Sequence, residues 1–95
     1  MDPTTKIRAH PQAAFRRLSE ERGGVLLNLE TAAYHAVNDT GALIWELLEP
    51  GTAFQELVAS LQERLEDPGE TLEADAAEFV ADLAERGLVT LEDGE

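Results

Sequence analysis

The stretch "LETAAYHAVNDTGALIWELLE", from Leu29 to Glu49, decides the fold of this chain. It opens on a reversal, continues as a short apolar segment over Ala32–Val37, and then enters a helix-forming segment. Asn38 or Asp39 can cap the free amides of the first helical turn. Apolar side chains cover nearly the whole circumference of this helix, so we expect it to be central and buried. They are Leu43, Ile44, Trp45, Leu47 and Leu48.

Two more strands are predicted before this stretch. The segment "AAFRRLSE", Ala13–Glu20, is compatible with a poorly marked strand, and "VLLNL", Val25–Leu29, is an apolar run rich in strand formers. Between them "ERGG", Glu21–Gly24, contains two glycines that can adopt positive φ in a turn. Together with the segment Ala32–Val37, these runs predict a small antiparallel meander.

Two more helices are predicted after it. The first of them opens at Thr52 with Gln55 three residues later, as a capping box requires, and ends at "EDPGE". The last runs from Thr71 to Arg86, with Gly87 at the position after the cap, and "LVTL" follows as an extended tail. The order predicts an α+β domain that is winged helix-turn-helix-like, with a three-stranded antiparallel sheet followed by three helices.

A chain of 95 residues predicts one domain. We expect a flexible arm over residues 1–12, the folded domain over residues 13–91, and a disordered tail over residues 92–95. The sequence contains no cysteine, and no apolar run approaches the roughly 18 residues of a membrane span. These features predict a cytoplasmic protein without a membrane partner.

The net charge of −13 is distributed unevenly. Residues 1–47 carry five basic and six acidic side chains, a net of −1, whereas residues 48–95 carry two basic and fourteen acidic ones, a net of −12. Affinity for nucleic acid comes largely from Lys and Arg at phosphates, so this surface disfavours DNA and RNA as partners. Solubility alone is an alternative explanation of the acidic excess.

Residue patterns for catalysis or metal binding are nearly absent. His10 and His35 are the two histidines, and they lack the spacing of metal ligands. Ser19 and Ser60 have no evident partner base, and no glycine-rich phosphate loop is present. We therefore expect a protein that is not an enzyme and that holds no metal or cofactor.

The remaining chemistry is that of an open sheet edge. A meander has two edges, and free backbone groups at an edge can accept another strand. The small side chains of Ala32, Ala33 and Ala36 let a peptide backbone approach, and Tyr34 adds an aromatic ring and a hydroxyl group. The alternative is that the alanines pack tightly under a helix and that Tyr34 is half-buried.

The chain resembles the PqqD-like family of peptide-leader recognition elements over about residues 14–90. The features that carry the resemblance are Leu27 and Leu29 before "ET", then Tyr34, Val37-Asn38, Gly41 and "IWELL", followed by Leu57, Leu61, Asp75, Phe79, Leu83 and "GLV". The resemblance implies a non-catalytic adaptor that binds the leader of a ribosomally made precursor peptide. The leader would add an antiparallel strand to the third strand, in a groove walled by the third helix.

Among such proteins, the chain looks most like the stand-alone members of lasso-peptide pathways. That likeness implies a leader with a Tyr-x-x-Pro motif, a transglutaminase-like cysteine leader peptidase as partner, and a cyclase that acts afterwards. A chaperone of another modified peptide, such as pyrroloquinoline quinone, is the nearest alternative. A winged-helix transcription regulator and a structural subunit that binds no peptide are the others.

The expected peptide-binding residues lie on the third strand and the third helix. The resemblance places the strand contacts at Ala32, Ala33, Tyr34, His35, Ala36 and Val37. On the helix, Asp75, Phe79, Asp82 and Arg86 are separated by four, three and four positions and so share one face. Arg16, Arg17 and Arg22 form a cationic cluster that we expect to dock a partner protein.

Overall fold

Two three-stranded antiparallel sheets and three helices make up the described part of the chain. The structure, a computed structural model, describes residues 2–17, 23–65 and 69–92. The elements in chain order are β1 Lys6–Ala9, β2 Ala13–Arg17, β3 Gly24–Asn28, β4 Ala33–Val37, α1 Asp39–Leu48, β5 Thr52–Ala53, α2 Phe54–Arg64, α3 Leu72–Glu85 and β6 Val89–Glu92. The predicted α+β class is confirmed, and the arrangement is compatible with a winged-helix-like fold.

The predicted meander is the sheet of β2, β3 and β4, in that order. Its register pairs Phe15 with Leu26 and Leu26 with His35. Gly23 adopts φ +73° just before β3, and a side chain there would collide with the carbonyl oxygen of Val37. The turn therefore requires glycine at this position, as "ERGG" predicted, although residues 18–22 lie outside the described residues.

A second sheet, with the order β5-β1-β6, was not predicted. The expectation of a flexible arm is wrong for Lys6–Ala9, because this segment pairs with both β5 and β6. The segment "LVTL" is likewise not a free tail, since it contributes most of β6. In the predicted tail 92–95, Glu92 ends β6, and residues 93–95 lie outside the described ranges.

The helix boundaries follow from their caps. Asn38 caps α1 as predicted, because its Oδ1 atom accepts a hydrogen bond from the Gly41 amide at 2.8 Å. The predicted capping box at Thr52 is wrong. Thr52 lies in β5, and α2 starts at Phe54 after Ala53, whose side chain makes no cap hydrogen bond.

The helix α3 ends in a Schellman motif, with Gly87 at the predicted position after the cap. Gly87 adopts φ +73°, and the Leu88 amide donates to the Leu83 carbonyl oxygen at 2.9 Å. The helix is one residue shorter at each end than predicted, with Thr71 and Arg86 as its caps. The chain then turns directly into β6.

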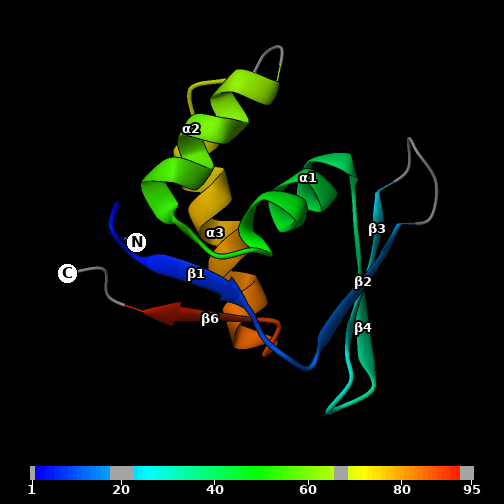
Figure 1. The fold of residues 1–95 in the computed structure, drawn as a ribbon. Helices are drawn as coiled ribbons and strands as arrows, with labels where there is room; N and C mark the ends of the chain where they lie inside the picture. Colours follow the sequence, from blue (N-terminus) through cyan, green and yellow to red (C-terminus); the bar gives the residue numbers. More distant parts are fainter. Residues whose placement is uncertain (1, 18–22, 66–68, 93–95) are drawn as a thin grey trace.

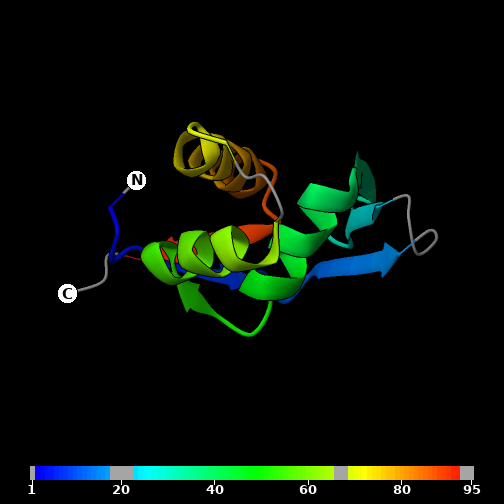
Figure 2. The same ribbon diagram turned by 90° about the horizontal axis from the view of Figure 1, so that it is seen from above.

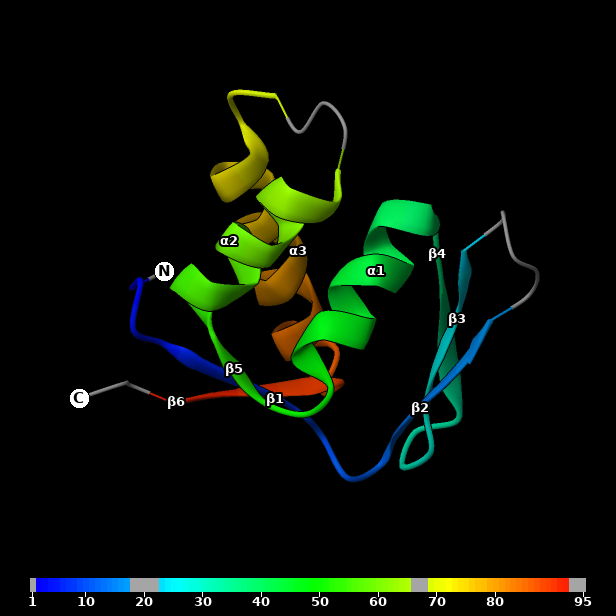
Figure 3. The same ribbon diagram turned by 45° about the horizontal axis from the view of Figure 1, so that its top comes forward.

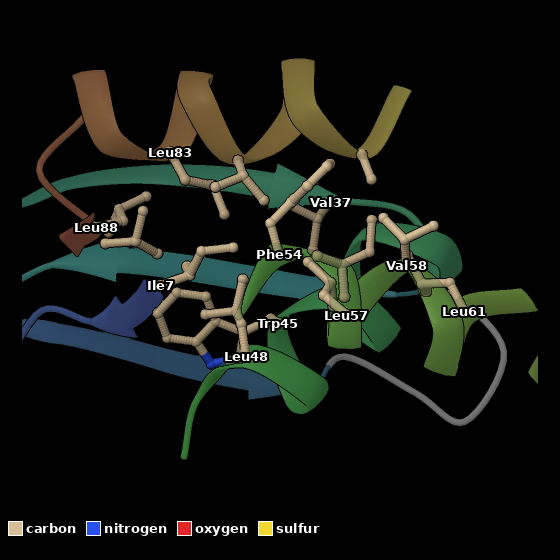
Figure 4. Close-up of a cluster of buried hydrophobic side chains, with 14 of the residues drawn as sticks. Ile7, Val37, Trp45, Leu48, Phe54, Leu57, Val58, Leu61, Leu83 and Leu88 are labelled. Carbon is tan, nitrogen blue, oxygen red and sulfur yellow. The ribbon is translucent and has the colours of Figure 1, made fainter. Parts of the chain in front are cut away.

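The hydrophobic core lies where the three helices meet both sheets. Trp45 and Leu48 of α1, Leu83 of α3 and Ile7 of β1 are almost fully buried. Figure 4 shows these side chains pointing into one cluster together with Val37 and Leu88. Since burial of one such side chain contributes about 1.5–3 kcal/mol, the cluster fixes the helices relative to the sheets.

The two sheets lie apart, and the β4 edge of the β2–β3–β4 sheet is open. In Figures 1 and 3, α1 lies between α2 and the β2–β3–β4 sheet. Seen from above in Figure 2, β4 lies on the same side of the molecule as α3, and β2 lies on the other side. The edge of the predicted meander therefore neighbours the acidic third helix.

Candidate functional site

The strand β4 is the edge of its sheet. Within the described residues it pairs with β3 alone, over Ala33–Val37. Its other side has no hydrogen-bonded strand in the ranges that the structure describes. An exposed edge of this kind presents a row of backbone donors and acceptors that another strand can bind.

The hydrogen bonds at the open end of the sheet show which backbone groups face outward. The Leu29 amide donates to the Gln12 carbonyl oxygen at 2.8 Å, so Leu29 faces the β2 side. The Asn28 carbonyl oxygen accepts from the Ala32 amide at 2.7 Å, so Asn28 faces the β4 side. Because backbone direction alternates along an antiparallel strand, every second residue of β3 faces β4.

This alternation assigns the backbone groups of β4. Leu26 and its partner His35 therefore face each other as a hydrogen-bonded pair, as do Gly24 and Val37. The backbone groups of Tyr34 and Ala36 therefore point away from β3, toward the open edge. These two residues supply the amides and carbonyls that an added strand would meet.

The side chains of β4 alternate as well. His35 is half-buried and Val37 is buried, whereas Ala33, Tyr34 and Ala36 are exposed. Tyr34 is 75% exposed, so the alternative reading of a half-buried packing residue is wrong. Ala32, predicted as part of this strand, lies just before it with φ +64°, a left-handed conformation that an alanine rarely adopts.

The helix α3 forms a wall beside this edge. A hollow of about 620 Å³ runs along it and is lined by Asp75, Glu78, Phe79, Ala81, Asp82 and Glu85. Asp75, Phe79 and Asp82, three of the four residues expected on one helix face, lie together there. Arg86 is not among the lining residues, but its Nε atom donates to Asp82 Oδ2 at 3.0 Å.

One contact joins the strand to this wall directly. His35 Nε2 on β4 lies 3.9 Å from Asp82 Oδ2 on α3. Asp75, about two helical turns earlier, accepts a hydrogen bond from Thr71 Oγ1 at 3.0 Å. Asp75 and Asp82 therefore have polar neighbours, and Asp75 is exposed whereas Asp82 is half-buried.

Phe79 lies where α3 meets the start of α1. A side chain at Gly41 would come within 3.1 Å of Phe79 Cζ and 2.9 Å of Val37 Cβ. The absence of a side chain at Gly41 therefore allows the half-buried Phe79 ring to lie close to α1 and the end of β4. This ring is the apolar part of the hollow's lining.

Asn28 is a residue of the site region that the sequence reading missed. It is 6% exposed, and its Nδ2 atom donates to the Arg86 carbonyl oxygen at the end of α3 at 2.9 Å. Its Oδ1 atom accepts from the amides of Glu30 and Thr31, in the loop before β4. A signal was present in the sequence, since a polar amide interrupts the apolar run "VLLNL".

The predicted arginine cluster is only partly described. Arg16 is exposed on β2, and Arg17 donates to Glu46 of α1. That hydrogen bond, with smaller opposing desolvation, raises the pKa of Arg17. Arg22 lies outside the described residues. On the sheet face next to Arg16, a second hollow of about 420 Å³ is lined by Ala14, Phe15, Arg16, Val25, Leu27 and Tyr34.

Two features of the described ranges bear on metal binding and membrane insertion. These ranges contain no group of three or more His, Asp or Glu side chains arranged to hold a metal ion. In the same part of the chain, no helix has both the length and the apolar character needed to cross a membrane.

Comparisons with known proteins give one family and two similar structures. The family described as "Coenzyme PQQ synthesis protein D (PqqD)" matches residues 23–89. A solved structure described as "Lasso peptide synthetase B1 complexed with the leader peptide" is 28% identical, with a TM-score of 0.71 over 88% of this chain and 96% of that chain. Another, "TbiB1 in Complex with the TbiA(beta) Leader Peptide", is also 28% identical, with a TM-score of 0.74 over 86% and 93%. No curated protein matches.

Proposed function

The chain belongs to the PqqD family, and we propose that it binds the leader segment of a ribosomally made precursor peptide as an added strand on β4. The observation that carries the proposal is the open edge of β4, with the backbone groups of Tyr34 and Ala36 directed outward beside the hollow of α3. Two similar structures, each described as a complex with a leader peptide, support it.

The alternation of side chains along β4 determines on which face of the sheet each leader side chain would lie. Residues directly opposite each other in antiparallel strands project their side chains to the same face. A leader residue opposite His35 would therefore point to the side of Asp82 and Phe79. Its two neighbours, opposite Tyr34 and Ala36, would point to the other face of the sheet. The protein would thus select leader residues at every second position.

The energetics suit a binder that later releases its peptide. Each added backbone hydrogen bond contributes about 0.5–1.5 kcal/mol net, and each buried apolar leader side chain about 1.5–3 kcal/mol. Ordering of the leader costs about 2–5 kcal/mol, and association has its own entropic cost. The remaining free energy corresponds to micromolar to nanomolar dissociation constants.

The recognition residues proposed on the strand side are Ala32, Ala33, Tyr34, His35, Ala36 and Val37. Ala32 precedes the strand, so its part would be to start β4 in the right direction. On the helix side, Phe79 would offer an apolar contact, and Asp75 and Asp82 would accept a hydrogen bond from a leader tyrosine or pair with a leader cation. Arg86 would contribute by holding Asp82, to which its Nε atom donates a hydrogen bond.

The pathway that we propose is lasso-peptide biosynthesis, in the cytoplasm. One of the two similar structures is described as a lasso peptide synthetase B1, and both are described as complexes with a leader peptide. The protein would act without catalysing a reaction itself, by presenting a leader with a Tyr-x-x-Pro motif to a transglutaminase-like cysteine leader peptidase. A cyclase would then close the ring. The description of the family favours pyrroloquinoline quinone synthesis as the second candidate.

Docking of the peptidase is proposed for the sheet that carries Arg16. The three strands of this sheet contain no acidic residue, although the whole chain has twenty. The apolar hollow beside Arg16 therefore fits an acidic partner surface. Arg17 and Arg22 belong to the same proposed docking cluster.

A titration tests the proposed function. A fluorescein-labelled leader of the precursor encoded beside this gene is titrated with the protein, and its anisotropy is followed. We expect saturable binding with a dissociation constant in the micromolar range or below, and no binding of a scrambled leader. Equal or absent binding of both peptides would overturn the proposal. Neighbouring genes for a peptidase and an asparagine-synthetase-like cyclase would distinguish the lasso pathway from quinone synthesis.

A further inference from the structure

Asn28 is a buried polar residue whose side chain uses both ends of its amide. Its Oδ1 atom accepts from the Glu30 amide at 2.9 Å and from the Thr31 amide at 3.3 Å. Its Nδ2 atom donates to the Arg86 carbonyl oxygen at 2.9 Å, across 58 positions of sequence. A side chain that is 6% exposed therefore links the β3–β4 loop to the end of α3.

The end of α3 is shaped to receive this amide. Arg86 is the C-cap of the helix, and its carbonyl oxygen is one of the terminal acceptors that the helix itself leaves without a partner. A side chain at Gly87 would come within 3.1 Å of Asn28 Nδ2. Glycine at position 87 thus provides both the left-handed turn and the space in which the Asn28 amide reaches the helix end.

The loop that Asn28 holds leads directly into β4. Glu30 and Thr31 are followed by Ala32 in its left-handed conformation, and the Ala33 amide donates to Thr31 Oγ1 at 3.3 Å. Displacement of this loop would change the direction in which β4 starts. It would also move the outward-facing groups of Tyr34 and Ala36 relative to α3.

Few polar contacts join α3 to the β3–β4 hairpin, which are the two walls of the proposed leader-binding groove. Among the described residues, the hydrogen bonds and ion pairs between α3 with its cap and the β3–β4 hairpin are the Asn28–Arg86 bond and the His35–Asp82 contact. The second is 3.9 Å long and joins partly exposed side chains. The first is shorter and is made by a buried side chain, so it is the stronger constraint on the spacing between the walls.

We infer that Asn28 is a positioning residue, which sets the spacing and direction of the β4 edge relative to α3 so that a leader strand fits between them. The inference rests on the proposed function and assigns a specific role to a residue that does not itself contact the leader. It requires an amide at position 28, because one end must accept from two loop amides while the other donates to a carbonyl oxygen.

A titratable substitution tests this role. In Asn28→Asp, one carboxylate oxygen keeps the loop hydrogen bonds, while the other replaces Nδ2 and faces the Arg86 carbonyl oxygen as a second acceptor. When that carboxyl group is protonated, its O–H can donate to the same carbonyl oxygen. We expect leader binding to be about tenfold weaker than wild type at pH 8, as for a buried group left unsatisfied, and to recover as the pH falls toward 5.

The measurement is the ratio of the mutant to the wild-type dissociation constant for the fluorescein-labelled leader, at each pH. The ratio removes the effect of groups common to both proteins, which include His35 and Asp82. All titrations are made at 10 °C, where circular dichroism verifies that each protein is folded. The matched control is Val58→Ala on α2, a core substitution away from the groove, and Asn28→Leu is the non-titratable comparison.

The outcomes separate positioning from general stability. We expect a tenfold ratio for Asn28→Asp at pH 8, a ratio within about twofold at pH 5, and a ratio near one for Val58→Ala at both. If Asn28→Asp binds like wild type, weakens only as much as Val58→Ala, or fails to recover at low pH, the inference is overturned. Failure of the wild-type protein to bind the leader would instead overturn the proposed function.

Discussion

His35 Nε2 on β4 lies 3.9 Å from Asp82 Oδ2 on α3, and Arg86 Nε donates to the same carboxylate oxygen at 3.0 Å. One oxygen atom therefore meets a group from each wall of the proposed groove. A cation or hydroxyl group of a bound leader would compete with His35 and Arg86 for this carboxylate. This shared contact is the reason to expect that Asp82 influences leader selection.

Removal of the acidic groups along α3 should weaken leader binding without unfolding the protein. We expect Asp82→Ala and Asp75→Ala each to raise the dissociation constant about two- to fivefold, because a partly exposed ion pair contributes about 0.2–1 kcal/mol. Higher salt should reduce the difference from wild type. Glu63→Gln on α2 is the charge-matched control. If both aspartate variants bind like wild type, the acidic residues of α3 have no part in recognition, although the leader could still bind as an added strand.

Proline at position 36 should interrupt the added strand. The Ala36 amide faces the open edge, so Ala36→Pro removes a donor to the leader and none to β3, and proline is tolerated at such an edge. We expect leader binding to weaken about tenfold or more, with little change in melting temperature. Ala36→Ser keeps the amide and is the control. Equal affinities of the proline and serine variants would contradict the proposed docking mode.

Truncation of Phe79 should remove the apolar contact of the groove. The ring is half-buried beside Gly41, and we expect Phe79→Ala to weaken leader binding about tenfold or more, as for loss of an apolar contact of about 1.5–3 kcal/mol. Phe79→Leu should fall between the alanine variant and wild type. Isothermal titration calorimetry provides the affinities, and thermal unfolding provides the stabilities. An alanine variant that is less stable but binds normally would assign Phe79 to the core alone.

Charge reversal on β2 should separate partner docking from leader binding. Arg16 is exposed, whereas Arg17 is hydrogen-bonded to Glu46, so Arg16→Glu should have the larger effect. We expect about fivefold less of the leader peptidase to be retained on immobilised Arg16→Glu protein, with unchanged leader affinity. Arg64→Glu on α2 is the control for net charge. Undiminished retention by Arg16→Glu would exclude this face of the sheet as the docking surface.

The elements with long apolar stripes were predictable from sequence. The helix α1 has apolar side chains around most of its circumference, and its cap, Asn38, was one of the two candidates that the sequence offered. The stop of α3 at Gly87 was also identified. The strand β4 was also located to within one residue at its start. The helices α1 and α3 each pack several side chains into the core, whereas β4 contributes Val37, so the sequence pattern and the burial agree best for the helices.

The second sheet was missed for a physical reason. Lys6–Ala9 has one fully buried side chain, Ile7, between two charged residues, and β5 has only two residues. Such short strands show no period, because pairing with distant segments rather than local preference holds them in place. Thr52 was similarly misread as a helix cap, because its segment pairs with β1 as strand β5 instead.

Part of the candidate site could be grouped from sequence, but its geometry could not. Helical spacing was sufficient to group Asp75, Phe79 and Asp82 on one face. Sequence could not indicate that Asn28 joins the hairpin to the end of α3, because that contact spans 58 positions and depends on the helix ending at Arg86. It also gave no basis for deciding which amides of β4 face outward, since this depends on the register with β3.

Amide hydrogen exchange of β4, measured by NMR with and without the leader, tests strand addition most directly. In the free protein, the His35 and Val37 amides should already be protected by β3, whereas the Tyr34 and Ala36 amides should exchange quickly. Saturation with the leader is expected to slow exchange at Tyr34 and Ala36 about tenfold or more. Unchanged exchange at both residues, with new protection on β2 or β6 instead, would contradict the account.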